Sequence, residues 1–277
     1  MNGSIRPVTG TTHETRPLLH EVIGTGDPLV LLPGTLSGWV QWVDHAARLA
    51  EHHTVIRAQL LSVELVEADE PFPEDYGVAM ERDALLATVD TLGLDRVDLA
   101  GWSSGGGVAL AFALAHPERV RTLTLIEPAA MWVLRETGRM TATYREMEAG
   151  DRALAIREVT IDDLKAFLVG AGLGPPYTTF EAHPRWEHWV RNRRALATNA
   201  TEWDHQESLE DLRRLSVPIL AVKGAETAAF LAAMIDGIVT NAPHVSLLEL
   251  PGGHACFLEH PEAFLTALEA HISEGVM

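Results

Sequence analysis

Cysteine is almost absent from this chain of 277 residues, where Cys256 stands alone. A single cysteine excludes an intrachain disulfide and a zinc site built from cysteines. Positive charge is also scarce, because 21 lysines and arginines face 39 aspartates and glutamates, and the formal net charge is −18. A surface this negative repels phosphate backbones and anionic lipids, so we expect neither a nucleic-acid partner nor a membrane partner.

Long apolar runs are missing as well. Residues 1–17 contain no apolar run, and no stretch approaches the roughly 18 apolar residues of a membrane span, so we expect no signal peptide and no such span. The sequence contains no motif for a phosphate, a dinucleotide or a metal ion, and we expect no cofactor and no metal. We therefore expect a cytoplasmic protein. Its expected partner is a hydrophobic small-molecule substrate, and a homodimer is an assembly that the sequence allows.

Short apolar, β-branched runs alternate with segments of helical spacing along most of the chain. This alternation predicts repeated βα units, which means an α/β fold with a mostly parallel sheet flanked by helices. The expected strands cover residues 29–32, 53–60, 97–101, 121–127, 218–222 and 245–250.

The alternation stops at about Met131 and resumes after about Leu215. Between them we find helical segments and turn signals but no strand, which predicts a helical insertion. The expected organisation is a core domain of residues 1–130 and 216–277, interrupted by a helical lid at 131–215. Residues 129–216 hold 12 basic and 14 acidic side chains. The insertion is thus nearly neutral, as expected of a surface that meets an uncharged ligand.

The pattern G-x-S-x-G occurs at Gly101-Trp102-Ser103-Ser104-Gly105. It follows an expected strand and begins a helix of small apolar residues. In that setting the serine is held in a strained main-chain conformation with its hydroxyl exposed, which favours a nucleophile.

A serine hydroxyl needs a base to become a good nucleophile. His254 lies in Pro251-Gly252-Gly253-His254-Ala255, directly after the last expected strand. A loop at that edge of a parallel sheet is where open α/β sheets place their ligands. His116, His260 and His271 fall in or beside helices, so we expect structural roles for them.

With the strands, the serine motif and the histidine in place, residues from about 20 to 272 resemble the α/β-hydrolase fold family with a helical lid. In that family the triad acid often lies three residues after a glycine that ends the strand following the lid. This chain has Thr227 there, and threonine lacks the carboxylate that the role requires. Some family members carry the acid at the earlier strand end, where this chain has Glu127, and we prefer Glu127 with Glu226 as the alternative.

The oxyanion hole needs two main-chain N–H donors. The residue after the nucleophile, Ser104, is expected to supply one of them. The loop after strand 29–32 is expected to supply the other from Thr35. Family members usually have His-Gly before this position, whereas this chain has Pro33-Gly34, which removes a side chain but keeps the donor.

Bulky apolar residues gather near the motif and in the insertion, which holds four of the seven tryptophans. We expect substrate contacts from Leu36, Trp102, Trp132, Trp186 and Trp189. The sequence thus predicts a serine hydrolase that cleaves an ester or lactone of a bulky hydrophobic molecule. The alternatives are another chemistry on the same fold, such as C–C bond hydrolysis or cyclisation, and a hydrolase-like receptor without catalysis.

Overall fold

The computed structural model describes residues 16–173, 179–204 and 207–275. Residues 1–17, where we expect no signal peptide, therefore lie almost entirely outside the described residues. A seven-stranded sheet with the order β1-β3-β2-β4-β5-β6-β7 forms the centre of the molecule. Its strands are β1 (His20–Ile23), β2 (Asp27–Leu32), β3 (His53–Ala58), β4 (Val97–Trp102), β5 (Val120–Ile126), β6 (Ile219–Gly224) and β7 (Val245–Leu250).

All six strands expected from the sequence are present, and they pair in parallel. The short strand β1 was not expected from the sequence. It pairs antiparallel with β3 at the edge of the sheet and has no fully buried residue, so it lacks the apolar run that marks the other strands. The predicted α/β fold class is confirmed.

The helices along the chain are α1 (Val43–Leu49), α2 (Leu61–Glu67), α3 (Val78–Thr91), α4 (Ser104–Ala115), α5 (Met131–Glu136), α6 (Ala142–Leu154), α7 (Ile161–Gly170), α8 (Trp186–Asn192), α9 (Leu209–Arg214), α10 (Ala229–Asn241), α11 (Cys256–Glu259) and α12 (Pro261–Glu274). Short 3-10 helices add η1 (Trp39–Trp42), η2 (Pro117–Arg119), η3 (Phe180–Ala182) and η4 (Arg193–Trp203). None of the helices in the described ranges is long and apolar enough to cross a bilayer.

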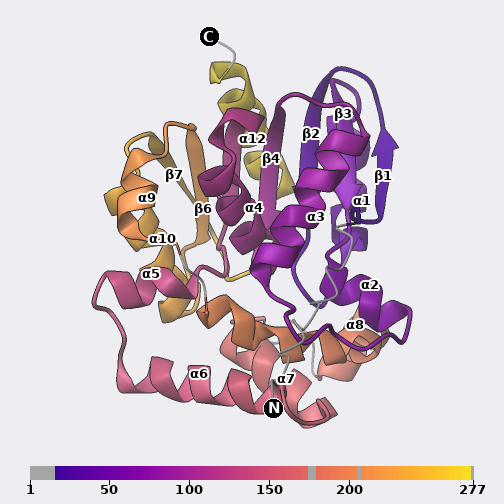
Figure 1. Ribbon diagram of the computed structural model, residues 1–277, viewed down its shortest axis with the longest axis vertical. Helices are drawn as coiled ribbons and strands as arrows, with labels where there is room; N and C mark the ends of the chain where they lie inside the picture. The colour runs from indigo at the N-terminus through magenta and orange to yellow at the C-terminus, as the bar shows by residue number, and fades with distance from the viewer. Residues whose placement is uncertain (1–15, 174–178, 205–206, 276–277) are drawn as a thin grey trace, which may run out of the picture.

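Alternating side chains of β2 build the two faces of the core. Val30 and Leu32 belong to the cluster that α3, α4 and α10 cover, whereas Leu29 and Leu31 belong to the cluster that α1 and α12 cover. This is the two-residue period of a strand that is buried on both faces. The result is a sheet with helices packed on each side (Figure 1).

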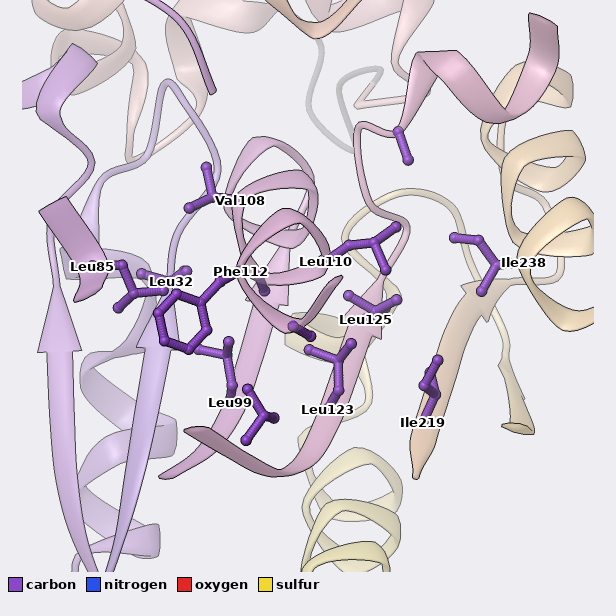
Figure 2. Packing of buried hydrophobic residues seen from close by; sticks show 14 of the residues in the cluster. Leu32, Leu85, Leu99, Val108, Leu110, Phe112, Leu123, Leu125, Ile219 and Ile238 are labelled. Atoms are coloured by element: carbon purple, nitrogen blue, oxygen red, sulfur yellow. The ribbon is translucent and has the colours of Figure 1, made fainter. Parts of the chain in front are cut away.

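Figure 2 shows the larger cluster around α4. Phe112 and Leu110 extend from α4 to opposite sides: the Phe112 ring lies beside Leu99 of β4, and Leu110 lies beside Leu125 of β5. These four residues are at most 1% exposed. Helix α4, which begins directly after Ser103, is therefore fixed on the sheet by its whole apolar length.

The described residues between β5 and β6 form five helices and two 3-10 helices, in agreement with the expected helical insertion. The first and last of them, α5 and α9, contribute Leu134 and Leu212 to the core cluster of the sheet. The middle elements form a cluster of their own, with Leu164, Leu168 and Leu196 fully buried. In Figure 1, α6, α7 and α8 lie together across one end of the sheet.

Candidate active site

Ser103 stands at the sharp turn from β4 into α4. Its φ of 54° and ψ of −123° lie outside the regions that residues with a side chain normally adopt. Main-chain hydrogen bonds hold the turn: the Ser103 N–H donates to Ile126 O at 3.0 Å, and the Gly107 N–H donates to Ser103 O at 3.0 Å. A Cβ on Gly101 or Gly105 would collide with a main-chain carbonyl, which explains both glycines of the motif.

His254 lies in the loop after β7, and its ring is directed at Glu127. The distance from His254 Nδ1 to Glu127 Oε2 is 2.6 Å, and both residues are at most 2% exposed. A carboxylate can only accept, so Nδ1 carries the proton and Nε2 is left as the basic nitrogen. Ser103 and His254 line the same cavity.

Glu127 directly follows β5 and is completely buried. Its Oε1 accepts the Gly224 N–H at 2.7 Å, and its Oε2 accepts the Thr227 hydroxyl at 2.7 Å in addition to His254. Three donors offset the cost of burying this carboxylate. Of the two acids considered from the sequence, the structure brings Glu127 to the histidine, whereas Glu226 is exposed.

The two amides expected to form the oxyanion hole lie on adjacent segments. Gly34 packs against the Trp102 ring and the Ser103 Cβ, so the next residue, Thr35, stands beside the nucleophile. Within the described part of the chain, the N–H groups of Thr35 and Ser104 donate to no main-chain oxygen. Both donors are available to an oxygen bound next to Ser103, and the first turn of α4 adds its positive end.

A chain of hydroxyl groups links these two residues to the insertion. Thr35 Oγ1 and Ser104 Oγ are 2.5 Å apart, and Ser104 Oγ donates to Glu202 Oε1 at 2.6 Å. Glu202 comes from η4 and is only 8% exposed. Burial raises the pKa of the Glu202 carboxyl to about 8, and the nearby Asp151 acts in the same direction.

A cavity of about 310 Å³ opens over Ser103 between the sheet and the insertion. Its walls are largely apolar, with contributions from Met131, Met147, Leu154, Phe167, Phe230 and Leu231. The polar groups include Asn199, Asp151 and Glu202. Arg157 also lines it, but this guanidinium is held in a two-pronged pair with Asp163 at 2.6 and 2.7 Å.

The five residues expected to contact the substrate are not among the described residues that line this cavity. Leu36, Trp186 and Trp189 pack in the cluster of the insertion. Trp132 is 2% exposed within the core cluster of the sheet. Burial stabilises large apolar side chains most, and here other residues of the protein bury them rather than a ligand.

Trp102, the fifth of them, instead supports the histidine loop. Its indole N–H donates to His254 O at 2.8 Å, and the centroids of the two rings are 4.9 Å apart. Its role in the structure is to hold His254 in place.

Two contributors to the site were not found from the sequence. The bond from Thr227 to Glu127 was missed because Thr227 was considered only as a replaced acid. Glu202 carried no signal, since it is one of 14 acidic residues in the insertion and nothing in its spacing points to Ser104.

Known proteins with similar sequences include hydrolases of two kinds. The chain is 38% identical over 111 residues to a 2-hydroxy-6-oxo-2,4-heptadienoate hydrolase of Pseudomonas putida, a match that spans only 39% of each protein. It is 25% identical over 260 residues to a pimeloyl-[acyl-carrier protein] methyl ester esterase of Aeromonas hydrophila, which covers 90% of this chain and 96% of the esterase.

The fold is shared with many solved structures. A thermophilic esterase from Thermogutta terrifontis superimposes with a TM-score of 0.75 at 22% identity, over 93% of each chain. At that sequence identity, the structural similarity is evidence for the fold alone. A sequence model of the alpha/beta hydrolase family matches residues 29–267. The matched segment includes most of β2, strands β3 to β7, the serine turn and the histidine loop. The chain belongs to the alpha/beta hydrolase family.

Proposed function

We propose that this protein is a serine hydrolase that cleaves the ester or lactone bond of a bulky, uncharged, hydrophobic small molecule. The observation that carries the proposal is the 2.6 Å hydrogen bond between His254 and buried Glu127, at a cavity that Ser103 and His254 both line. This arrangement gives the histidine the tautomer and the orientation that a general base needs.

In the proposed reaction, His254 Nε2 takes the Ser103 hydroxyl proton as Oγ attacks the substrate carbonyl carbon. The oxygen of the tetrahedral intermediate accepts hydrogen bonds from the Thr35 and Ser104 amides. His254 then donates its proton to the leaving alcohol oxygen, and an acyl-enzyme remains. Water, activated by the same histidine, releases the acid and restores Ser103.

The cavity lining supports an uncharged substrate. The side chains around it are mainly apolar, and three carboxyl groups, Asp151, Asp163 and Glu202, lie among them. Arg157 already has its charge matched by Asp163. An anionic substrate would have to leave water for a site that offers it no unpaired cation among these lining residues, which is unfavourable.

Hydrolysis of a carbon–carbon bond is the second candidate, because the chain is 38% identical over 111 residues to a 2-hydroxy-6-oxo-2,4-heptadienoate hydrolase. The substrate in that name is a carboxylate. The pairing of Arg157 with Asp163 leaves no unpaired cation among the described lining residues for such a carboxylate, which argues against it here. A direct comparison decides between the candidates.

The test compares the purified wild type with Ser103→Ala on three substrates: a p-nitrophenyl ester with a bulky acyl group, a neutral macrocyclic lactone and a 2-hydroxy-6-oxo-dienoate. We expect turnover of a neutral substrate and a loss of at least ~10³-fold in kcat in the variant. Cleavage of the dienoate alone would favour the second candidate. A folded Ser103→Ala protein that keeps most of the ester hydrolysis would refute the serine mechanism.

A further inference from the structure

Glu202 is a buried carboxyl for which the described residues provide no cation. The ionisable groups that face it are Asp151 from α6 and, through a small adjoining cavity, Tyr76 and Glu81. Arg135 of α5 comes near but donates to the main-chain oxygen of Trp203. Burying such a group is costly, so the one hydrogen bond that the described residues give its side chain, from Ser104, is the contact to explain.

We propose that Glu202 is a positioning residue that fixes the oxyanion hole through the hydroxyl groups of Ser104 and Thr35. The inference rests on the proposed function, because it assigns the two amides to an oxyanion. It adds that η4 of the insertion sets the distance between these amides, although Glu202 itself does not touch the reacting atoms.

The direction of the hydrogen bonds follows from their donors. Ser104 Oγ donates its only proton to Glu202 Oε1, so its remaining contact at 2.5 Å requires the Thr35 hydroxyl as donor. The loop after β2 is thereby tied to the first turn of α4. An oxyanion hole works because its donors are held in place before the reaction, and this chain of bonds holds both residues that carry them.

The protonation state of Glu202 gives the arrangement a pH dependence. Burial raises its pKa to about 8, so near pH 7 the carboxyl is mostly neutral. A negative charge on the Glu202 carboxyl would lie next to the hydroxyl group of Ser104, whose amide binds the oxyanion. This charge would repel the negative charge that develops in the transition state and would slow the reaction. Acylation of Ser103 is therefore expected to slow as the pH rises above about 8.

The experiment measures the second-order rate of Ser103 labelling by a fluorophosphonate, whose phosphoryl oxygen occupies the oxyanion hole and which requires no natural substrate. The proteins are the wild type, Glu202→Leu, Glu202→Gln, Ser104→Ala and the double variant Ser104→Ala with Glu202→Leu. Glu64→Gln is the control, because burial also raises the pKa of Glu64 but its bonds go to Leu19 and Arg16.

We expect Glu202→Leu and Ser104→Ala each to slow labelling about tenfold at pH 7, the effect of losing one hydrogen bond of the network. In the double variant the loss should be no greater than in Ser104→Ala alone, since both changes break the same link. Glu202→Gln keeps the acceptor and carries no charge, so it should label like the wild type at pH 7 and lose the decline above pH 8. Glu64→Gln should keep that decline.

Three results would overturn the inference while Ser103 is still labelled in the wild type: an unchanged rate in Glu202→Leu, additive losses in the double variant, or an unchanged pH profile in Glu202→Gln. If Glu202→Leu does not fold, the pH profile of Glu202→Gln and the rate of Ser104→Ala still decide. A wild type that is not labelled at Ser103 would instead refute the proposed function.

Discussion

Glu127 has a main-chain conformation that few glutamates adopt, with a φ of 41° directly after β5. Such a conformation costs energy and persists only where the surrounding structure enforces it. Here the Glu127 N–H donates to Val222 O, and the side chain receives three donors. The strain is thus coupled to a carboxylate that is aimed at His254.

We predict first that Glu127→Gln lowers kcat by ~10²–10⁴-fold while the protein stays folded. Glutamine keeps the shape but removes the charge that stabilises the His254 imidazolium, and its NH₂ group disturbs the tautomer. Steady-state ester hydrolysis and a melting curve measure the two effects. Glu226→Gln is the matched control and should cost little, because that side chain is exposed. The reverse pattern would place the acid after β6.

The candidate acid could be found from the sequence, but its environment could not. Glu127 was preferred because some family members carry the acid at the end of this strand, and a carboxylate at the end of an apolar strand is costly to bury without a partner. Thr227, in the position where many family members have their acid, donates to Glu127 across 100 residues of sequence. No local pattern encodes a contact between the ends of two neighbouring strands.

Among the elements, the insertion shows what helical spacing does and does not determine. Trp186 and Trp189 are three residues apart, and the structure places both on the buried side of α8. The spacing identifies a shared face, but it does not say whether a ligand or the protein covers that face. Here Leu36 and the α7 side chains Leu164 and Leu168 cover it.

The second prediction concerns α7, whose Phe167 lines the cavity. Phe167→Ala should lower kcat/KM for a bulky ester by a factor that corresponds to about 1–3 kcal/mol of transition-state stabilisation. The kcat/KM for p-nitrophenyl acetate should stay nearly unchanged, because the acetyl group is too short to make that contact. Kinetics on the two esters measure the difference. Trp189→Ala provides the contrast: it should destabilise the protein by about 3–5 kcal/mol through lost packing. Equal losses on both esters in Phe167→Ala would show that the cavity does not hold the acyl group.

For the molecule as a whole, the alternation of apolar runs was enough to predict the parallel strands and their helices. It was not enough for β1, which is short, partly exposed and paired at the edge, so that pairing and not burial defines it. The helical insertion was visible as a gap in the alternation. The packing of α5 and α9 against the core was not, because apolar helices look alike wherever they pack.

The third prediction links Glu202 to the stability of the whole protein. Its pKa is about 8 in the folded protein, against an ordinary value of 4.5. Between these values the folded state keeps a proton that the unfolded chain has released, so the free energy of unfolding falls as the pH rises from about 5 to 8. We expect this group to contribute roughly 2–4 kcal/mol to that fall.

Urea unfolding of the wild type and Glu202→Gln at pH 5.5 and pH 8 measures this contribution. Glutamine does not titrate, so the variant should gain stability relative to the wild type as the pH rises. Wild-type and variant stabilities that change in parallel would show that Glu202 ionises as easily in the folded protein as in the unfolded chain.

The most direct test of the central claim, that Ser103 is activated by His254 and Glu127, is a crystal structure of the protein after reaction with a fluorophosphonate. We predict a covalent bond from Ser103 Oγ to phosphorus, with the phosphoryl oxygen about 2.7–3.1 Å from the amides of Thr35 and Ser104 and with His254 Nδ1 on Glu127. Phosphorus on another residue, or a phosphoryl oxygen turned away from these amides, would contradict it.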